Sequence, residues 1–125
     1  MKVKRTERGW VGHFISAHNC RFRRNTLLEY KRIKIVVSTV GCMIDPMFKQ
    51  FREVGVNRHY ETMAFHSDPT DKRYHDIDVS KQVLFESSWA IKELDADDKA
   101  NLMHEKVVEE IMLGLEAGNK YRSSR

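Results

Sequence analysis

The chain has 125 residues, 41% hydrophobic and 32% charged, which is the size and balance of one globular domain with its own core rather than a disordered chain. No apolar run reaches the ~18 residues of a membrane helix, and the start MKVKRTERGW lacks the apolar stretch of a signal peptide, so we expect a cytoplasmic protein without a membrane partner. The net charge of +4 is uneven: residues 1–35 hold ten Lys and Arg against two Glu, and the remaining 90 hold twelve against sixteen acidic residues.

The first 65% of the chain predicts strands. Residues 1–8 form a basic segment before a first predicted strand at 10–17. In CRFRR, Arg21 and Arg23 alternate with Cys20 and Phe22 and should face the other side of a strand. Arg24-Asn25 interrupts the alternation and predicts a bulge or kink. A turn at 31–32 then leads into the strongest strand, 33–41, which is rich in β-branched residues.

The middle of the chain is less regular. Asp45-Pro46 can open a short helical turn, after which Phe48 and Phe51 would share a face and cover the edge of the sheet. Residues 58–67 and 75–87 alternate again and predict two further strands, and SWAI predicts a short additional one.

A long helix is predicted near the C-terminus. Asp95 is the expected cap, and Asp97 and Asp98 place negative charge in the first turn. Gly118-Asn119 should end the helix, leaving residues 119–125 as a frayed tail. The apolar positions share a helical spacing: Ala100, Met103, Val107, Ile111 and Leu115.

Together these elements predict a single α+β domain over residues 1–125. It would be an antiparallel meander of about five strands with one long C-terminal helix packed on it.

Histidine and aspartate gather between residues 66 and 78. If the strands at 58–67 and 75–87 pair as a hairpin, His66, His75, Asp76 and Asp78 come near one another and could bind Zn²⁺ or a redox metal. The competing interpretation is a polar loop, since Asp favours turns and the spacing matches no metal motif. We favour the loop, and therefore no metal and no cofactor.

Other residue types point away from an enzyme. Cys20 and Cys42 are expected to be reduced thiols, and a nucleophile pairing Cys20 with His13 or His18 lacks an orienting third residue. In the helix, His104 should be a boundary residue and Glu105 a solvated charge. Glycine-rich nucleotide loops and the GxSxG elbow are missing from the sequence.

The basic stretch at 21–34 is the candidate binding surface. A solvated sheet face is the plain interpretation, because charge also prevents edge-to-edge pairing. Interleaved aromatic and basic residues also suit single-stranded nucleic acid. An acidic partner is the third interpretation. The candidate partner-binding residues are Arg21, Arg23, Lys31, Arg32 and Lys34.

Several segments resemble small uncharacterised proteins encoded by bacteriophages and prophages: FRRNTLLEY, IVVSTVG, YETMAFH, DVSKQVLFES and ANLMHEKVVEE. The resemblance covers roughly residues 2–118 and includes no catalytic motif. It implies a protein made in a bacterial cytoplasm that binds a host protein or nucleoprotein complex, with counter-defence as one version. We expect such a non-enzymatic accessory protein acting through its basic face; the alternatives are a nucleic-acid-binding domain on the basic β-surface and a metal-dependent enzyme at residues 66–78.

Overall fold

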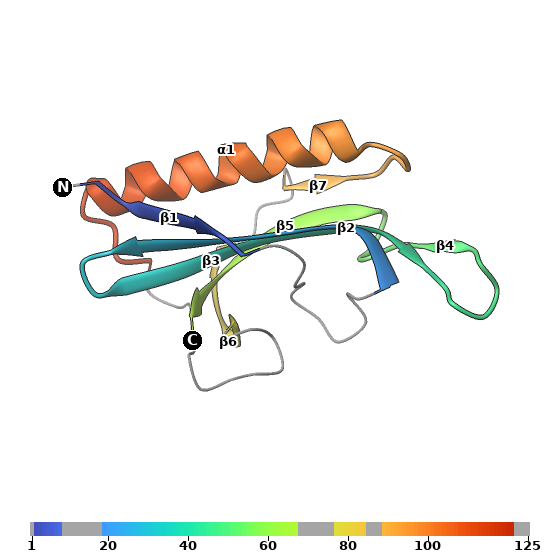
Figure 1. The fold of residues 1–125 in the computed structure, drawn as a ribbon, viewed down its shortest axis with the longest axis horizontal. Coiled ribbons are helices and arrows are strands. Elements are labelled where there is room, and N and C mark those ends of the chain that lie inside the picture. The colour runs from blue at the N-terminus through green and yellow to red at the C-terminus, as the bar shows by residue number, and fades with distance from the viewer. Residues whose placement is uncertain (1, 9–18, 68–76, 85–88, 122–125) are drawn as a thin grey trace.

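The structure, a computed structural model, describes residues 2–8, 19–67, 77–84 and 89–121. It has the predicted α+β architecture, in which one long helix lies across one face of an antiparallel sheet (Figure 1). The elements in chain order are β1 (Lys4–Glu7), β2 (Cys20–Tyr30), β3 (Ile33–Ile44), β4 (Phe51–Arg52), β5 (Tyr60–Ser67), β6 (Ile77–Leu84), β7 (Ala90–Ile91) and α1 (Asp97–Glu116).

The long β2–β3 hairpin forms the middle of the sheet. The strand order is β1-β2-β3-β5-β6, while β4 pairs with the end of β3 and β7 pairs with β5. The predicted turn at 31–32 is confirmed, with Lys31 at φ 57°. The predicted irregularity at Arg24-Asn25 is wrong, because both residues stay in register with β3. The backbone leaves the extended conformation instead at Cys42, where φ is 52°.

The basic N-terminal segment belongs to the sheet rather than preceding it. Residues 4–7 pair with 26–29 as the edge strand β1. The strand predicted at 10–17 lies outside the described residues. Those predicted at 58–67, 75–87 and in SWAI correspond to β5, β6 and β7, and residues 75–76 and 85–88 of these predictions lie outside the described residues.

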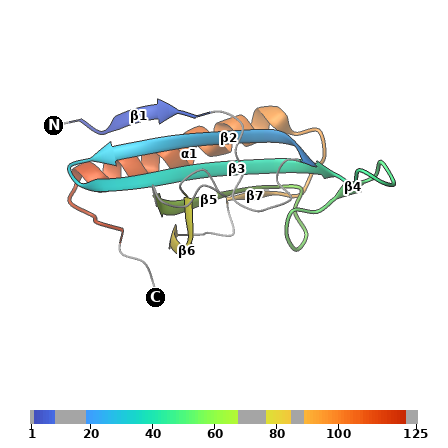
Figure 2. The same cartoon turned by 60° about the horizontal axis from the view of Figure 1, so that its bottom comes forward.

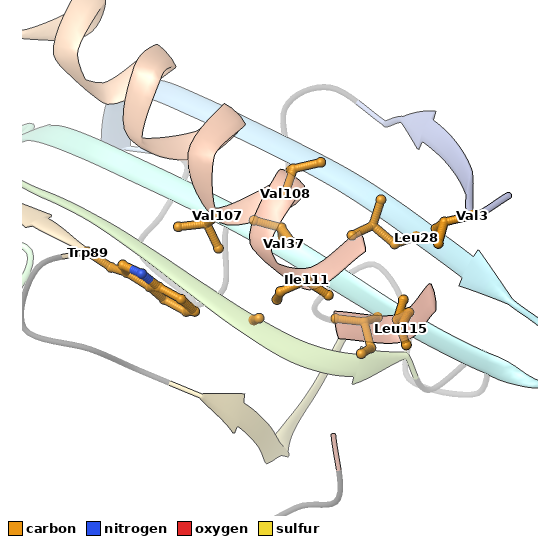
Figure 3. Close-up of a cluster of buried hydrophobic side chains, with 10 residues drawn as sticks. Val3, Leu28, Val37, Trp89, Val107, Val108, Ile111 and Leu115 are labelled. Carbon is orange, nitrogen blue, oxygen red and sulfur yellow. The ribbon is translucent and has the colours of Figure 1, made fainter. Parts of the chain in front are cut away.

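The main core lies between α1 and the sheet (Figure 3). Val107, Ile111 and Leu115 are buried there as predicted, against Leu28, Val37 and Trp89 from the strands. Burial of such side chains contributes roughly 1.5–3 kcal/mol each, so this interface holds the helix in place. The opposite face of the sheet is also buried at Val36, Val40 and Phe65, as the unbroken run of β-branched residues in β3 requires.

Both ends of α1 differ from the prediction in part. Asp97 and Asp98 occupy the first turn, but the N-cap residue is Ala96 and no side chain caps the helix, so the prediction of an Asp95 cap is wrong. At the other end, Gly118 adopts φ 94° and terminates the helix.

Residues 119–121 are not frayed. Tyr121 packs against the main core, and its backbone oxygen accepts a hydrogen bond from His66 Nε2. Residues 122–125 lie outside the description. Within the described segments, no helix combines the length and apolar character needed to cross a bilayer.

Candidate functional site

The basic residues predicted to form one surface lie at opposite ends of the β2–β3 hairpin (Figure 2). Arg21 and Arg23 are at the start of β2, while Lys31, Arg32 and Lys34 are at the turn. Lys31 lies eight residue steps along the strand from Arg23, which is about 27 Å. The hairpin therefore presents two small basic sites rather than one continuous face.

Arg21 is committed to the protein's own acidic groups. Its guanidinium forms an ion pair with Asp95, lies 4.0 Å from Asp97 Oδ1, and sits over the Phe51 ring at 5.7 Å. The alternation predicted that Arg21 lies on the side of the strand opposite Phe22, but Phe22 packs with Ala96 and Ala100 near the helix start, on the same side as the ion pair of Arg21 with Asp95. The change of backbone at Cys42, the residue across from it, accompanies the observed position beside the helix N-terminus.

The turn end of the hairpin keeps its charge exposed. Lys31, Arg32 and Lys34 are all exposed. In the sheet register, Lys4 faces Glu29, and Glu29 faces Lys34, so a carboxylate separates the two lysines in one cross-strand row. That carboxylate reduces the positive potential of this end.

The metal-site candidates are only partly within the description. His66 lies on β5 with Nε2 engaged by the backbone oxygen of Tyr121. His75 and Asp76 are outside the described residues, and Asp78 lies on β6, where only the backbone is placed. In the described parts of the chain, His, Cys, Asp and Glu form no group suited to a metal ion.

Both cysteines are buried thiols. Burial raises the pKa of Cys20 to about 12, which disfavours the reactive thiolate. Cys42 donates a hydrogen bond to Tyr60 Oη at 2.9 Å, and Tyr60 donates to Asp97 Oδ1 at 2.6 Å. Tyr60 Oη also accepts from the backbone N–H of Ala96 at 2.8 Å, so this chain of bonds fixes the start of α1 on the sheet.

His104 is fully buried between α1 and the sheet, so its prediction as a boundary residue is wrong. Its Nε2 lies 2.7 Å from Thr26 Oγ1 and its Nδ1 lies 2.7 Å from Thr39 Oγ1. Thr39 Oγ1 is in turn 2.6 Å from Thr62 Oγ1, and Thr26 Oγ1 is 2.7 Å from Glu7 Oε1.

The carboxylate of Glu7 sets the donor and acceptor of every hydrogen bond in the series from Glu7 to Thr62. An ionised Glu7 only accepts, so Thr26 donates to it and must itself accept from His104 Nε2–H. Nδ1 then carries the lone pair and accepts from Thr39, which accepts from Thr62. Burial, reinforced by the positive charge of Arg24, lowers the pKa of His104 to about 3 and keeps the ring neutral.

At the Glu7 end of this series of hydrogen bonds, two carboxylates and two guanidinium groups form ion pairs. Glu105 is bonded to Arg5 at 2.6 Å and to Arg24 at 2.9 Å, and Glu7 is bonded to the same two arginines. The side chain of Glu105 is 45% exposed, as expected for a solvated charge, but it is paired with two arginines. Its hydrogen bond from Arg5, against the opposing effect of burial, lowers its pKa to about 2. His104 has no exposed surface, and the network joins α1 to β1, β2, β3 and β5.

Exposed apolar side chains gather at the end of the sheet beyond β3. Met47 is 79% exposed, Phe48 63%, Phe51 40% and Val56 85%. We call Met47, Phe48 and Phe51 the apolar tip, because Val56 is exposed on a separate turn between β4 and β5. The prediction that Phe48 and Phe51 cover the sheet edge is wrong, because this segment projects past the sheet beside β4 (Figures 1 and 2). Exposed large hydrophobics elsewhere in the described chain are dispersed: Leu94, Leu102 and Leu113.

The backbone of the apolar tip is held by its own hydrogen bonds. Asp45 Oδ1 accepts from the N–H groups of Met47 at 2.8 Å and Phe48 at 3.1 Å, and Oδ2 accepts from Arg52 at 2.9 Å. Hydrogen bonding from these backbone N–H groups, Phe48 first, lowers the pKa of Asp45. A separate turn then leads into β5 through bonds between Val54 and Arg58 and between Arg58 and Gly55, with Val56 exposed on it.

The comparisons with known proteins supply no relative. No protein-family model matches this chain, and no curated protein or solved structure matches it either. The assignment of a function therefore depends on the geometry of the described residues.

Proposed function

We propose that this chain is a non-enzymatic binding protein that inserts the apolar tip into a hollow on a folded protein partner. The observation that carries the proposal is the exposure of Met47 and Phe48 on one ordered turn. Monomeric proteins seldom gather large apolar side chains on an exposed projection without a binding role. Full burial of each of these side chains would contribute roughly 1.5–3 kcal/mol.

The order of this turn supports the same proposal. Affinity is reduced when a binding segment must become ordered on association. Because Asp45 already fixes the backbone of Met47 and Phe48, this cost is small for the apolar tip.

Positive charge beside the apolar tip favours an acidic rim on the partner. Lys49 is exposed on the same turn, whereas Arg52 and Arg21, which lie next to Phe51 in the chain or in space, are already paired with Asp45 and Asp95. Of the five basic residues proposed from the sequence, only Arg21 is placed to join this interface by a contact with the tip. If the resemblance to phage-encoded proteins holds, the partner is a bacterial host protein, and counter-defence is one outcome of binding it.

The proposal is tested by passing nuclease-treated bacterial lysate over the immobilised chain and identifying the proteins that it retains. The immobilised parent is compared with Met47→Ser/Phe48→Ser and with a matched control, Leu102→Ser/Leu113→Ser, which removes two exposed apolar residues from α1. A protein held by the parent and the control but lost by the tip variant, at equal melting temperatures, supports the proposal. Equal retention by all three contradicts it.

The nucleic-acid alternative has one observation in its favour, the exposed Lys31, Arg32 and Lys34 at the hairpin turn. Binding to phosphates would weaken with salt by nearly one unit of log slope per contact. Binding of single-stranded DNA that is unaffected by Lys31→Glu/Arg32→Glu rules this surface out.

A further inference from the structure

A groove runs between β7 and α1, at the edge of the sheet away from β1. Trp89 and Ile91 line it from the strand side, and Met103 and Val107 line it from the helix. Figure 3 shows Trp89 next to Val107 at this side of the core. The hollow measures about 190 Å³, which is below the roughly 300 Å³ of a small-molecule pocket and suits one or two side chains of a larger ligand.

Within the described residues, one backbone edge of β7 beside the groove has no strand partner. Among the described strands, β7 pairs only with β5. The carbonyl groups of Trp89 and Ile91 accept from Thr62 and His59 in and beside β5. Since backbone groups alternate along an antiparallel strand, the N–H and C=O of Ala90 point to the opposite edge. This edge can accept a further strand.

The helix side of the groove carries positive charge. Lys99 and Lys106 line it, with one carboxylate, Glu110. Lys99 contacts Glu93 at 3.4 Å, whereas Lys106 has no ion-pair partner in the part of the chain that the structure describes. Glu93 itself does not line the groove.

We propose that this groove binds an extended acidic peptide segment of a partner protein, which adds to β7 as a strand. The backbone of the segment pairs with Ala90, and alternate side chains of the segment face α1. There Lys99 and Lys106 favour a segment with Asp or Glu side chains over one with Lys or Arg. The site is separate from the apolar tip and does not depend on it.

A titration of the ¹⁵N-labelled full chain tests the proposal by NMR. The probes are acetyl-Ser-Glu-Val-Glu-Val-Ser-amide and the same peptide with Lys in place of Glu. We expect saturable shifts at Ala90, Ile91 and Lys106 with the acidic peptide and none with the basic one. Lys106→Glu should weaken binding by at least about fivefold, while Lys2→Glu, the same charge change near the opposite edge, should leave it unchanged.

The backbone contribution has its own variant. Ala90→Pro removes an N–H that faces away from β5, so an edge strand tolerates it and the fold should persist while binding is lost. If that variant does not fold, the acidic peptide with N-methyl groups on alternate amides replaces it, and it should not bind the parent. Met47→Ser/Phe48→Ser should bind the peptide as the parent does, so failure of the proposed function would leave this result intact.

Three results would overturn the proposal. They are shifts that do not saturate at millimolar peptide, an equal effect of Lys106→Glu and Lys2→Glu, and tighter binding of a short oligothymidylate than of the acidic peptide.

Discussion

Acid should destabilise this protein through His104. In the folded state its ring is neutral and its pKa is about 3, whereas an unfolded chain carries an ordinary histidine with a pKa near 6.5. The unfolded state therefore binds more protons between these values. The stability due to the neutral ring is fully present above about pH 6.5 and is lost as the pH falls below it.

The expected loss of stability follows from the difference between the folded and unfolded pKa values of His104. Each pH unit between these two values lowers the free energy of unfolding by up to ~1.4 kcal/mol, so a change from pH 7 to pH 5 should cost about 2 kcal/mol. Below about pH 4.5, protonation of Glu105, whose folded pKa is about 2, adds to the loss in the same direction. Urea unfolding followed by circular dichroism at half-unit steps of pH measures the slope.

His104→Gln identifies the residue responsible. The amide can still donate to Thr26 but cannot also reach Thr39, so the variant should lose about 1–3 kcal/mol at pH 7 and have a flatter profile between pH 5 and 7. His59→Gln, the same change at a half-buried position, is the matched control. A slope that persists in His104→Gln, or an NMR titration of His104 near pH 6.5, would refute the reasoning.

The other predictions concern packing, charge and the thiols. Ile111→Ala should cost roughly 2–5 kcal/mol in urea unfolding because the side chain is buried, and exposed Leu113→Ala should cost far less. Gly41→Ala should lower the melting temperature sharply, since a methyl group there would overlap the Tyr60 ring, which hydrogen bonds hold in place. Arg21→Glu should keep the far-UV spectrum but slow partner association. Cys20→Ser should leave partner binding intact. A folded Cys20→Ser variant that no longer binds the partner would contradict the prediction that this thiol has no role in binding.

The regular part of the fold was predictable from local pattern. Period-two alternation located β2 and β5, the run of β-branched residues located β3, and the spacing of Val107, Ile111 and Leu115 identified the buried side of α1. These signals are strong because one face of each element is uniformly apolar. The pairing of residues 4–7 as β1 was missed because the sequence KRTE is polar and its role depends on a partner strand far along the chain.

The site was far less predictable. His104 seemed a boundary residue because its partners, Thr26 and Thr39, belong to strands more than sixty residues away. Phe48 and Phe51 were expected to cover the edge of the sheet because an apolar side chain carries no signal of exposure. The charge-rich stretch suggested one surface, but the length of an eleven-residue strand separates its two ends.

Site-specific photo-cross-linking in bacterial cells tests the central claim most directly. The photoreactive residue p-benzoylphenylalanine replaces Phe48 in one variant and Leu102 in the other, so that both positions are exposed and apolar in the parent. Insertion of the apolar tip into a partner predicts one discrete covalent adduct from position 48 and none from position 102. Equal adducts from both positions, or adducts from position 102 alone, would contradict the proposal that the apolar tip is the binding surface.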